Sequence, residues 1–301
     1  MITLDIQETG TRLYMPSDLS ECDTRQYNAI AALLYQLQHR EIPYEVFRIR
    51  AVYALLNMQV VDNKSQELQD LKMSNVYQVS ELIDSFFEAG EEEGTNILKQ
   101  YYVHNPLAKV RPVVRAYFGP SNDFTNMKFG EYIDALHFFT EFHETQDKEF
   151  LYQLMATCYR PKKRWLFIKK HRANYDGDIR VQHNQNHVER RALKFKLLEF
   201  GAVYGFFLLF ASFQKYLCSA KIYWQGKEID LSILFNTADN SESDIPGIGM
   251  KSMLFTLAES GAFGSIKELR QESLWEILLR MYDLSKRDAD FKAKQQSLKT
   301  T

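Results

Sequence analysis

The sequence predicts a mostly α-helical protein, with a helical bundle-like body, an N-terminal helical hairpin lobe and minor β elements. Three observations predict this class. Apolar residues recur at helical spacing in several long segments. Only 13 glycines and 7 prolines occur among 301 residues, which disfavours turn-dense β architectures. Hydrophobic residues make up 45% of the chain, and a chain of this length can bury a substantial core.

The first expected elements form the helical hairpin. Residues 1–20 are typical of an irregular or short-stranded lead-in, and Asp23 or Thr24 is a suitable N-cap for the helix that follows. The apolar residues of this helix are Tyr27, Ile30, Leu33, Leu34 and Leu37. Pro43 opens a second helix, because a proline in the first turn loses no hydrogen bond. The short loop at 40–42 then predicts an antiparallel pair.

The middle of the chain carries the candidate domain boundary. Residues 61–100 are polar and weakly periodic, and the acidic run at 91–93 is typical of a solvated loop. The next segment, 101–127, contains three prolines and marks a connector. The sequence therefore predicts three parts, which are an N-terminal helical lobe at 1–100, a proline-containing connector at 101–127 and a larger helical domain with small β additions at 128–301.

The larger domain begins with the clearest periodic signal. Apolar residues from 129 to 139 fit one face of a helix, and they are Phe129, Tyr132, Ile133, Leu136 and Phe139. A second helix over 150–158 is expected to end before Pro161, since the residue before a proline is pushed out of the α region. Short strands are expected around 163–168 and 222–235.

Two further helices are expected near the C-terminal end. One runs from about 249 to 260 and ends at Gly261, because glycine favours the position that follows a helix. The last helix starts near Glu272 and carries Leu274, Trp275, Ile277, Leu278 and Met281. Beyond Leu284 the chain is highly charged, and we expect it to fray.

The apolar segment 200–214 is the candidate for a membrane span. It holds 15 residues without a charge, between Glu199 and Lys215, whereas a span needs about 20. We therefore predict a buried central helix and no membrane span. An interfacial membrane segment and an oligomer interface through its phenylalanines are the alternatives. Gly201 and Gly205 indicate close packing of this helix against a neighbour.

The sequence offers no catalytic residue and no cofactor site. Cys22, Cys158 and Cys218 are odd in number and form no CxxC pair. They indicate reduced thiols in an intracellular setting rather than a disulfide framework or a zinc site. The segment 247–249 lacks the third glycine of a dinucleotide fingerprint, and we find neither a P-loop nor a GxSxG elbow.

A metal site at the histidines is the weaker of two interpretations. His183 and His187 are four residues apart, with Glu189 nearby, and on a helix they would share one face. Asn184 occupies the place of the glutamate in HExxH, and the surrounding run is typical of a polar loop. We therefore predict no metal site.

Acidic residues of the helix at 129–139 and beyond could in principle supply acid–base chemistry. Asp134, Glu141 and Glu144 are expected on its solvated face, because nothing in the sequence buries them or couples them to a partner. We therefore predict that the protein is not an enzyme. An enzyme with an unrecognised site is the remaining alternative, and it would need a buried titratable cluster in a concave pocket.

A basic and aromatic cluster lies at 160–172. Its members are Arg160, Lys162, Lys163, Arg164, Trp165, Phe167, Lys169, Lys170 and Arg172. This mixture suits phosphate contacts and base stacking, but the net charge of −2 argues against a dedicated nucleic-acid protein. The run 165–168 also has the pattern of a buried strand with solvated flanks. We predict a solvated or protein-contact surface, with nucleic-acid binding as the alternative.

Several segments of the sequence occur in a distinctive order. They are Phe118 to Asp123 (FGPSND), Met127 to Tyr132 (MKFGEY), and Phe150 to Pro161, which ends in Cys-Tyr-Arg-Pro. This order resembles tailed-phage proteins and their prophage relatives, in which a helix opening with F-G-E-Y or F-G-E-F precedes one ending in L-Y-R-P. The segments 175–177, 205–207 and 257–264 are similar as well. Cys158 departs from the aliphatic residue expected before the tyrosine.

The resemblance implies a role in tail or baseplate assembly, as a particle component or as a dedicated assembly chaperone. It implies protein partners, namely other tail or assembly proteins and further copies of the chain, and no cofactor. We expect the protein in the cytoplasm of a host cell or within a tail-like particle. The expected partner contacts are Tyr159, Arg160, Lys162, Lys163, Arg164 and Trp165 on one surface and Trp275, Leu278 and Tyr282 on the last helix.

Overall fold

The computed structural model confirms the mostly α-helical class, with a helical body and a few short strands. It describes residues 1–6, 10–59, 66–90, 96–169, 171, 175–219, 221–224, 226–234 and 265–299. Short 3-10 helices connect the longer elements at Leu19–Glu21, Glu81–Phe86, Asn122–Phe124, Gln185–His187 and Leu231–Leu234.

The N-terminal lobe contains the expected helical hairpin. Strands β1 (Ile2–Ile6) and β2 (Thr11–Met15) pair antiparallel, and helices α1 (Thr24–Gln38) and α2 (Tyr44–Leu55) follow and pack together. Asp23 is the N-cap of α1, and its side chain and that of Gln26 cap each other's backbone N–H groups. Pro43 directly precedes α2 and serves as its N-cap.

A third helix of this lobe was not expected from the sequence. Helix α3 (Gln66–Ser80) lies in the segment 61–100, where apolar residues do not form a clear helical stripe. Val76 is buried, whereas Leu71, Met73 and Tyr77 remain exposed, which explains the weak periodicity. Strands β3 (Phe87–Ala89) and β4 (Asn96–Leu98) follow as an antiparallel pair. The acidic run at 91–93 lies outside the described residues.

Segment 101–127 takes part in the core. Strands β5 (Lys109–Val110) and β6 (Tyr117–Phe118) pair antiparallel within it, and Tyr102, Leu107 and Phe124 are buried. Buried side chains from 1–100, 101–127 and 128–301 join one apolar cluster. The division into two parts and a connector stays a prediction.

The body contains two expected helices and one that was not expected. Helices α4 (Phe129–Thr145) and α5 (Lys148–Cys158) lie where the sequence predicts them, whereas α7 (Val188–Phe195) was not predicted, and α5 packs against both of the others. The strand expected around 163–168 is wrong, because helix α6 (Leu166–Lys169) occupies this place. Trp165, Phe167 and Ile168 are exposed, so this apolar run is not the buried strand that the sequence predicts.

The apolar segment forms the buried central helix α8 (Phe200–Ser219). Within the described residues, α8 is long and apolar enough to cross a membrane by length and composition, but most of it is covered by protein. A Cβ atom on Gly201 would lie 2.0 Å from the carbonyl oxygen of Asn28, and one on Gly205 would lie 2.7 Å from the ring of Tyr27. The two glycines therefore allow the close approach of α1 that the sequence predicts.

Beyond α8, strands β7 (Lys221–Trp224) and β8 (Lys227–Asp230) pair antiparallel in the region where short strands were expected, around 222–235. Helix α10 (Ile266–Leu269) precedes α11 (Leu274–Lys299). The expectation that the chain frays beyond Leu284 is wrong, because α11 continues to Lys299. The helix expected at 249–260, with Gly261 and the glycines at 247–249, lies outside the described part of the chain.

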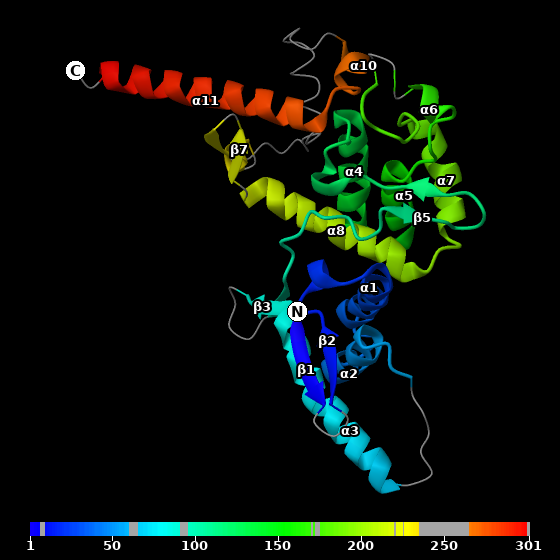
Figure 1. Ribbon diagram of the computed structural model, residues 1–301. Helices are drawn as coiled ribbons and strands as arrows, with labels where there is room; N and C mark the ends of the chain where they lie inside the picture. The colour runs from blue at the N-terminus through cyan, green and yellow to red at the C-terminus, as the bar shows by residue number, and fades with distance from the viewer. Residues whose placement is uncertain are drawn as a thin grey trace.

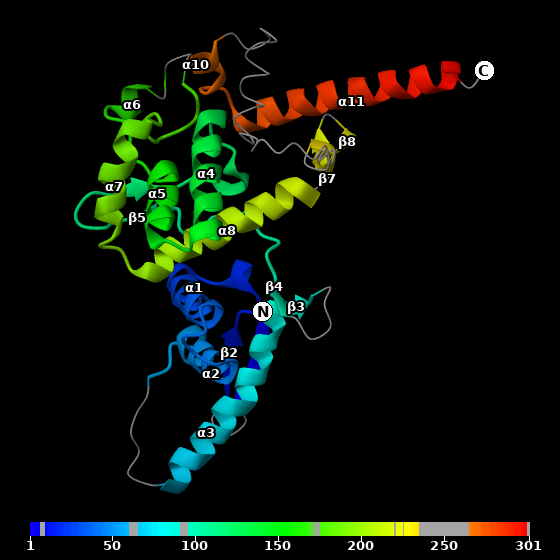
Figure 2. The ribbon, with the colours of Figure 1, turned by 180° about the vertical axis from the view of Figure 1, so that it is seen from behind.

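The helices are arranged around α8. It runs between the N-terminal lobe, where α1 contacts it, and the body, where α5 contacts it (Figure 1). Seen from either side, α3 extends away from the lobe and α11 extends away from the body (Figure 2). Two long helices therefore project from an otherwise closely packed molecule.

Candidate functional site

The C-terminal end of α5 is surrounded by arginines. A helix leaves its last carbonyl groups without partners inside the helix, and three guanidinium groups bind those at 156–158. Arg191 Nε lies 2.8 Å from the oxygen of residue 156, Arg160 Nη1 3.2 Å from that of 157, and Arg180 Nη1 2.7 Å from that of 158. Cations at this end also suit the negative pole of the helix dipole.

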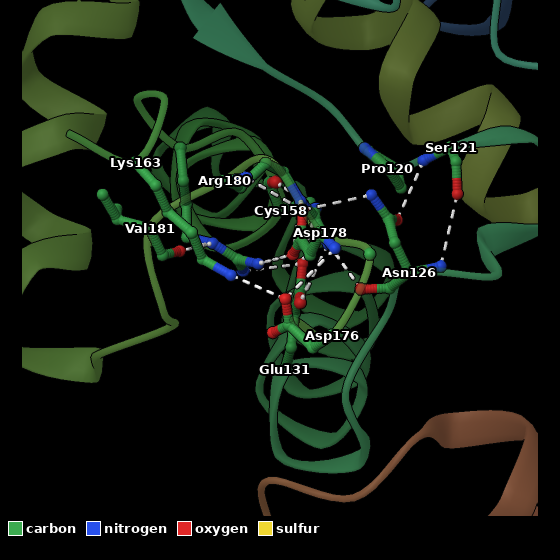
Figure 3. A network of polar contacts seen from close by, with 12 residues as sticks. Pro120, Ser121, Asn126, Glu131, Cys158, Lys163, Asp176, Asp178, Arg180 and Val181 are labelled. Carbon is green, nitrogen blue, oxygen red and sulfur yellow. Dashed lines mark hydrogen bonds and ion pairs between the residues drawn. The ribbon is translucent and has the colours of Figure 1, made fainter. Parts of the chain in front are cut away.

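Two buried carboxylates pair with two of these arginines. Glu131 Oε1 lies 2.8 Å from Arg160 Nη1 and 2.9 Å from Arg180 Nη1. Asp178 Oδ2 lies 3.2 Å from Arg160 Nη2, and its Oδ1 lies 3.0 Å from Arg180 Nε. All four side chains are buried, and Figure 3 shows Glu131, Asp178 and Arg180 pointing toward one another. We call these four residues the buried quartet.

The carboxylates of the quartet stabilise the positive charge of Arg180. Burial opposes the charge on Arg180, but Glu131 and Asp178 beside it hold the pKa of its guanidinium above the ordinary value. Burial likewise raises the pKa of the Cys158 thiol well above the ordinary value, and Glu131 adds to the effect. Cys158 is therefore a neutral, buried thiol rather than a reactive one.

Backbone pairing brings the quartet together from distant segments. Arg160 and Phe118 exchange two backbone hydrogen bonds, of 2.8 and 3.1 Å, next to strand β6. Lys162 and Arg180 form a further antiparallel bridge. Position 119 needs a glycine, because a Cβ atom there would lie only 2.6 Å from the ring of Tyr159. Parts of the segments 118–123, 127–132 and 150–161 thus meet at one place.

A second cluster of polar side chains surrounds Asp134 on α4 and connects this helix to later segments of the chain. Asp134 accepts hydrogen bonds from Arg270 Nη2 at 2.6 Å and Gln185 Nε2 at 2.6 Å, and its Oδ2 lies 2.7 Å from His183 Nε2. Burial by itself would raise the pKa of Asp134, but the bonds with His183 and Arg270 hold it below the ordinary value.

The solvated position expected for Asp134 is therefore wrong. Only 4% of this residue is exposed, because the segment at 183–185 and the side chain of Arg270 cover it. Glu144 is exposed, as expected for a solvated face, whereas Glu141 is half-buried.

The two histidines lie in a loop and a 3-10 turn rather than on one helix face. His183 Nε2 lies 2.7 Å from Asp134 Oδ2, and Nδ1 of the same ring is buried without a hydrogen-bond partner among the described residues. Among the described residues, no three histidine, cysteine or acidic side chains gather as a metal site would require.

A basic cavity of about 600 Å³ lies beside the quartet. Helix α7 and the loop between β5 and β6 form two of its sides. The lining residues are Arg115, Tyr117, Pro161, Val181, Gln182, His183, Asn184, His187, Arg190, Arg191 and Lys194. This set holds four permanent cations and no carboxylate, so the cavity attracts anions.

Arg191 connects the cavity to the quartet. Its side chain lines the cavity although only 7% of the residue is exposed, and its Nη2 is buried without a partner. Burial and the neighbouring charge of Arg160 lower the pKa of Arg191 to about 10. Arg191 is thus a cation that the surrounding protein does not fully compensate.

The residues expected to contact partners differ in burial, and some of them lie in the core. Tyr159, Arg160 and Leu278 are buried, so they are not part of a contact surface, which corrects the expectation for these three. Tyr159 donates a hydrogen bond of 2.7 Å to the carbonyl oxygen of Leu107 inside the core. Half-buried Lys163 lies 2.7 Å from Asp176.

The remaining predicted contacts reach the surface to different extents. Lys162 and Arg164 are exposed, and Trp165 is 59% exposed with the Arg164 guanidinium over its ring. Half-buried Trp275 donates a hydrogen bond of 3.0 Å to the carbonyl oxygen of Asp123. Tyr282 is half-buried on α11.

Sequence reasoning missed the quartet and the cavity. Glu131 and Arg180 are 49 positions apart and carry no local motif. The one available signal was the positive charge of Arg190, Arg191 and Lys194 on a short amphipathic helix. No family model, no curated protein and no solved structure matches the chain.

Proposed function

We propose that the chain is a non-enzymatic assembly protein of a phage-type tail or baseplate and acts through protein–protein contacts. The observation that carries the proposal is the outer half of α11, which leaves the body and still presents an apolar side chain. The ordered segments that resemble tailed-phage proteins are the reason for proposing a tail or baseplate as the particle.

The apolar face of α11 continues beyond the part that packs on the body. Ile277, Leu284 and Phe291 are seven residues apart, a spacing that keeps side chains on nearly the same face of a helix. Ile277 is fully buried and Leu284 half-buried against the core, whereas Phe291 is 62% exposed. With a rise of about 1.5 Å per residue, the helix is long enough to reach well past the body.

We infer that a helix of a partner subunit covers this face. Phe291 continues the spacing of Ile277 and Leu284, and apolar residues at this interval are those through which two helices pack. Isolated helical segments shorter than about 12–15 residues are marginal in water, so the outer half of α11 gains from such a cover. A particle component and an assembly chaperone both fit this arrangement.

Nucleic-acid binding through 160–172 is the less favoured function. Arg160 is buried in the quartet and Lys163 is paired with Asp176, so two of its cations are committed to internal contacts. Trp165 and Phe167 are exposed and could stack on bases. No observation on the described residues favours this function over protein contact.

The test compares Phe291→Asp with Asp290→Ser, an exposed neighbour on the same helix. Lysates of cells that assemble the particle are separated on a density gradient. Phe291→Asp should leave the unfolding temperature within about 1 °C, since exposed substitutions change stability little. It should remove the chain from its complexes, whereas Asp290→Ser should not. Unchanged co-sedimentation of Phe291→Asp would contradict the proposed contact.

A further inference from the structure

We propose that the basic cavity beside α7 binds the phosphate group of a small phosphorylated molecule. The proposal is independent of the assembly role. A volume of about 600 Å³ is within the range of small-molecule sites. The cavity is lined by cations from separate segments of the chain, and no carboxylate is among its lining residues.

The first argument is an imbalance of buried charge. Three arginines meet at the end of α5, but among the described residues Glu131 and Asp178 form ion pairs with Arg160 and Arg180 and not with Arg191. Within the described residues, Arg191 bonds a carbonyl oxygen through Nε and forms no ion pair with a carboxylate. A dianion in the cavity would supply the negative charge that this end of the cluster lacks, through charge-assisted hydrogen bonds.

The second argument is convergence of further cations on the same cavity. Arg190 and Lys194 are four residues apart on α7 and share one face, where like charges repel. Arg115 approaches from the loop between β5 and β6. No ion pair joins these three cations to a carboxylate in the part of the chain that the structure describes. An anion bridging them would remove the repulsion and hold α7 to the loop.

The third argument concerns the size of the ligand. Tyr117, Pro161 and Val181 give the cavity an apolar wall. Tyr117 is almost fully buried, edge-on against Phe195 at 5.1 Å between ring centroids, so it offers little ring surface to a base. A compact cavity without an exposed aromatic platform suits one phosphate group and a small body better than a single-stranded polymer.

The experiment measures binding to the full chain by calorimetry and by thermal shift at constant ionic strength. The probes are inorganic phosphate, adenosine 5′-monophosphate, adenosine and a single-stranded DNA 20-mer. The variant Arg190→Gln/Lys194→Gln is compared with Arg50→Gln/Lys267→Gln, which removes two exposed cations elsewhere. Arg115→Gln tests the opposite side of the cavity. All substituted side chains are exposed, so the unliganded unfolding temperatures should agree within about 1 °C.

We expect phosphate and the monophosphate to bind the wild type and the control, and adenosine to bind neither. At ten times the dissociation constant, the unfolding temperature should rise by about 2 °C. The double variant should bind at least about tenfold more weakly, because two charge-assisted contacts are lost, and Arg115→Gln should weaken binding as well.

Three results would overturn the proposal. One is the absence of binding of phosphate and the monophosphate at millimolar concentration. Another is equal affinity of the double variant and its control. The third is tighter binding of the DNA than of the monophosphate, lost in the double variant, which would assign the cavity to a nucleic-acid backbone instead.

Discussion

Substitution of Glu131 by Gln is the most direct perturbation of the buried quartet. Gln has nearly the same shape but no charge, so Arg160 and Arg180 would share Asp178 alone. Glu131 Oε1 lies 2.8 and 2.9 Å from the two guanidinium groups, and the exposed fraction of its side chain is zero. Removing one partner of a buried ion pair costs about 3–5 kcal/mol, because the remaining charge is left uncompensated.

This free energy corresponds to a measurable shift in unfolding temperature. With an unfolding entropy of about 2.1 cal/mol/K per residue, a loss of about 4 kcal/mol lowers the unfolding temperature of a 301-residue chain by about 6 °C. Circular dichroism melts and urea titrations provide the measurement.

The matched control is Glu144→Gln, at the exposed end of the same helix, with an expected change below about 0.5 kcal/mol. If Glu131→Gln lost less than about 1 kcal/mol relative to this control, the quartet would not be a dry, mutually dependent set of charges.

Three further predictions concern Asp134, the glycines of α8 and its core face. The pKa of Asp134 is held below its ordinary value of 3.8, so its stabilising effect is complete above about pH 4 and is lost as the pH falls through the folded value. The free energy of unfolding, measured by urea titration, should therefore fall less between pH 7 and pH 3 in Asp134→Asn than in the wild type. An equal fall in both proteins would refute this. Gly201→Ala should lower the unfolding temperature more than Gly205→Ala, because its Cβ atom would meet a backbone carbonyl group, which can move less than the side-chain ring that faces Gly205. The reverse order of unfolding temperatures would contradict this. Phe206→Asp places an unpaired charge in the core and should abolish folding; a folded, soluble variant would show that this face is an interface.

Elements with a strong apolar stripe and clear end signals could be predicted from the sequence. Asp23 was one of two candidate N-caps of α1, Pro43 precedes α2, and Gly201 and Gly205 indicated close packing of α8, although not that α1 is the neighbour. In these cases the deciding interaction is local or is fixed by the shape of one residue.

Other features depend on distant partners and could not be derived in this way. Asp134 has the sequence context of a solvated residue, and only the return of 183–185 and Arg270 buries it. Arg160 belongs to a basic run, but backbone pairing with Phe118 turns it into the core. The charged end of α11 remains helical although its sequence suggests fraying.

The central claim of protein assembly is tested most directly by sedimentation of the native chain. Particles and complexes from cells that produce the tail are separated on a density gradient, and each fraction is assayed for the chain. We expect it to co-sediment with tail proteins in fixed stoichiometry if it is a particle component, or in a small complex with one unassembled partner if it is a chaperone. A chain that sediments alone as a monomer, or bound to nucleic acid, would contradict an assembly role.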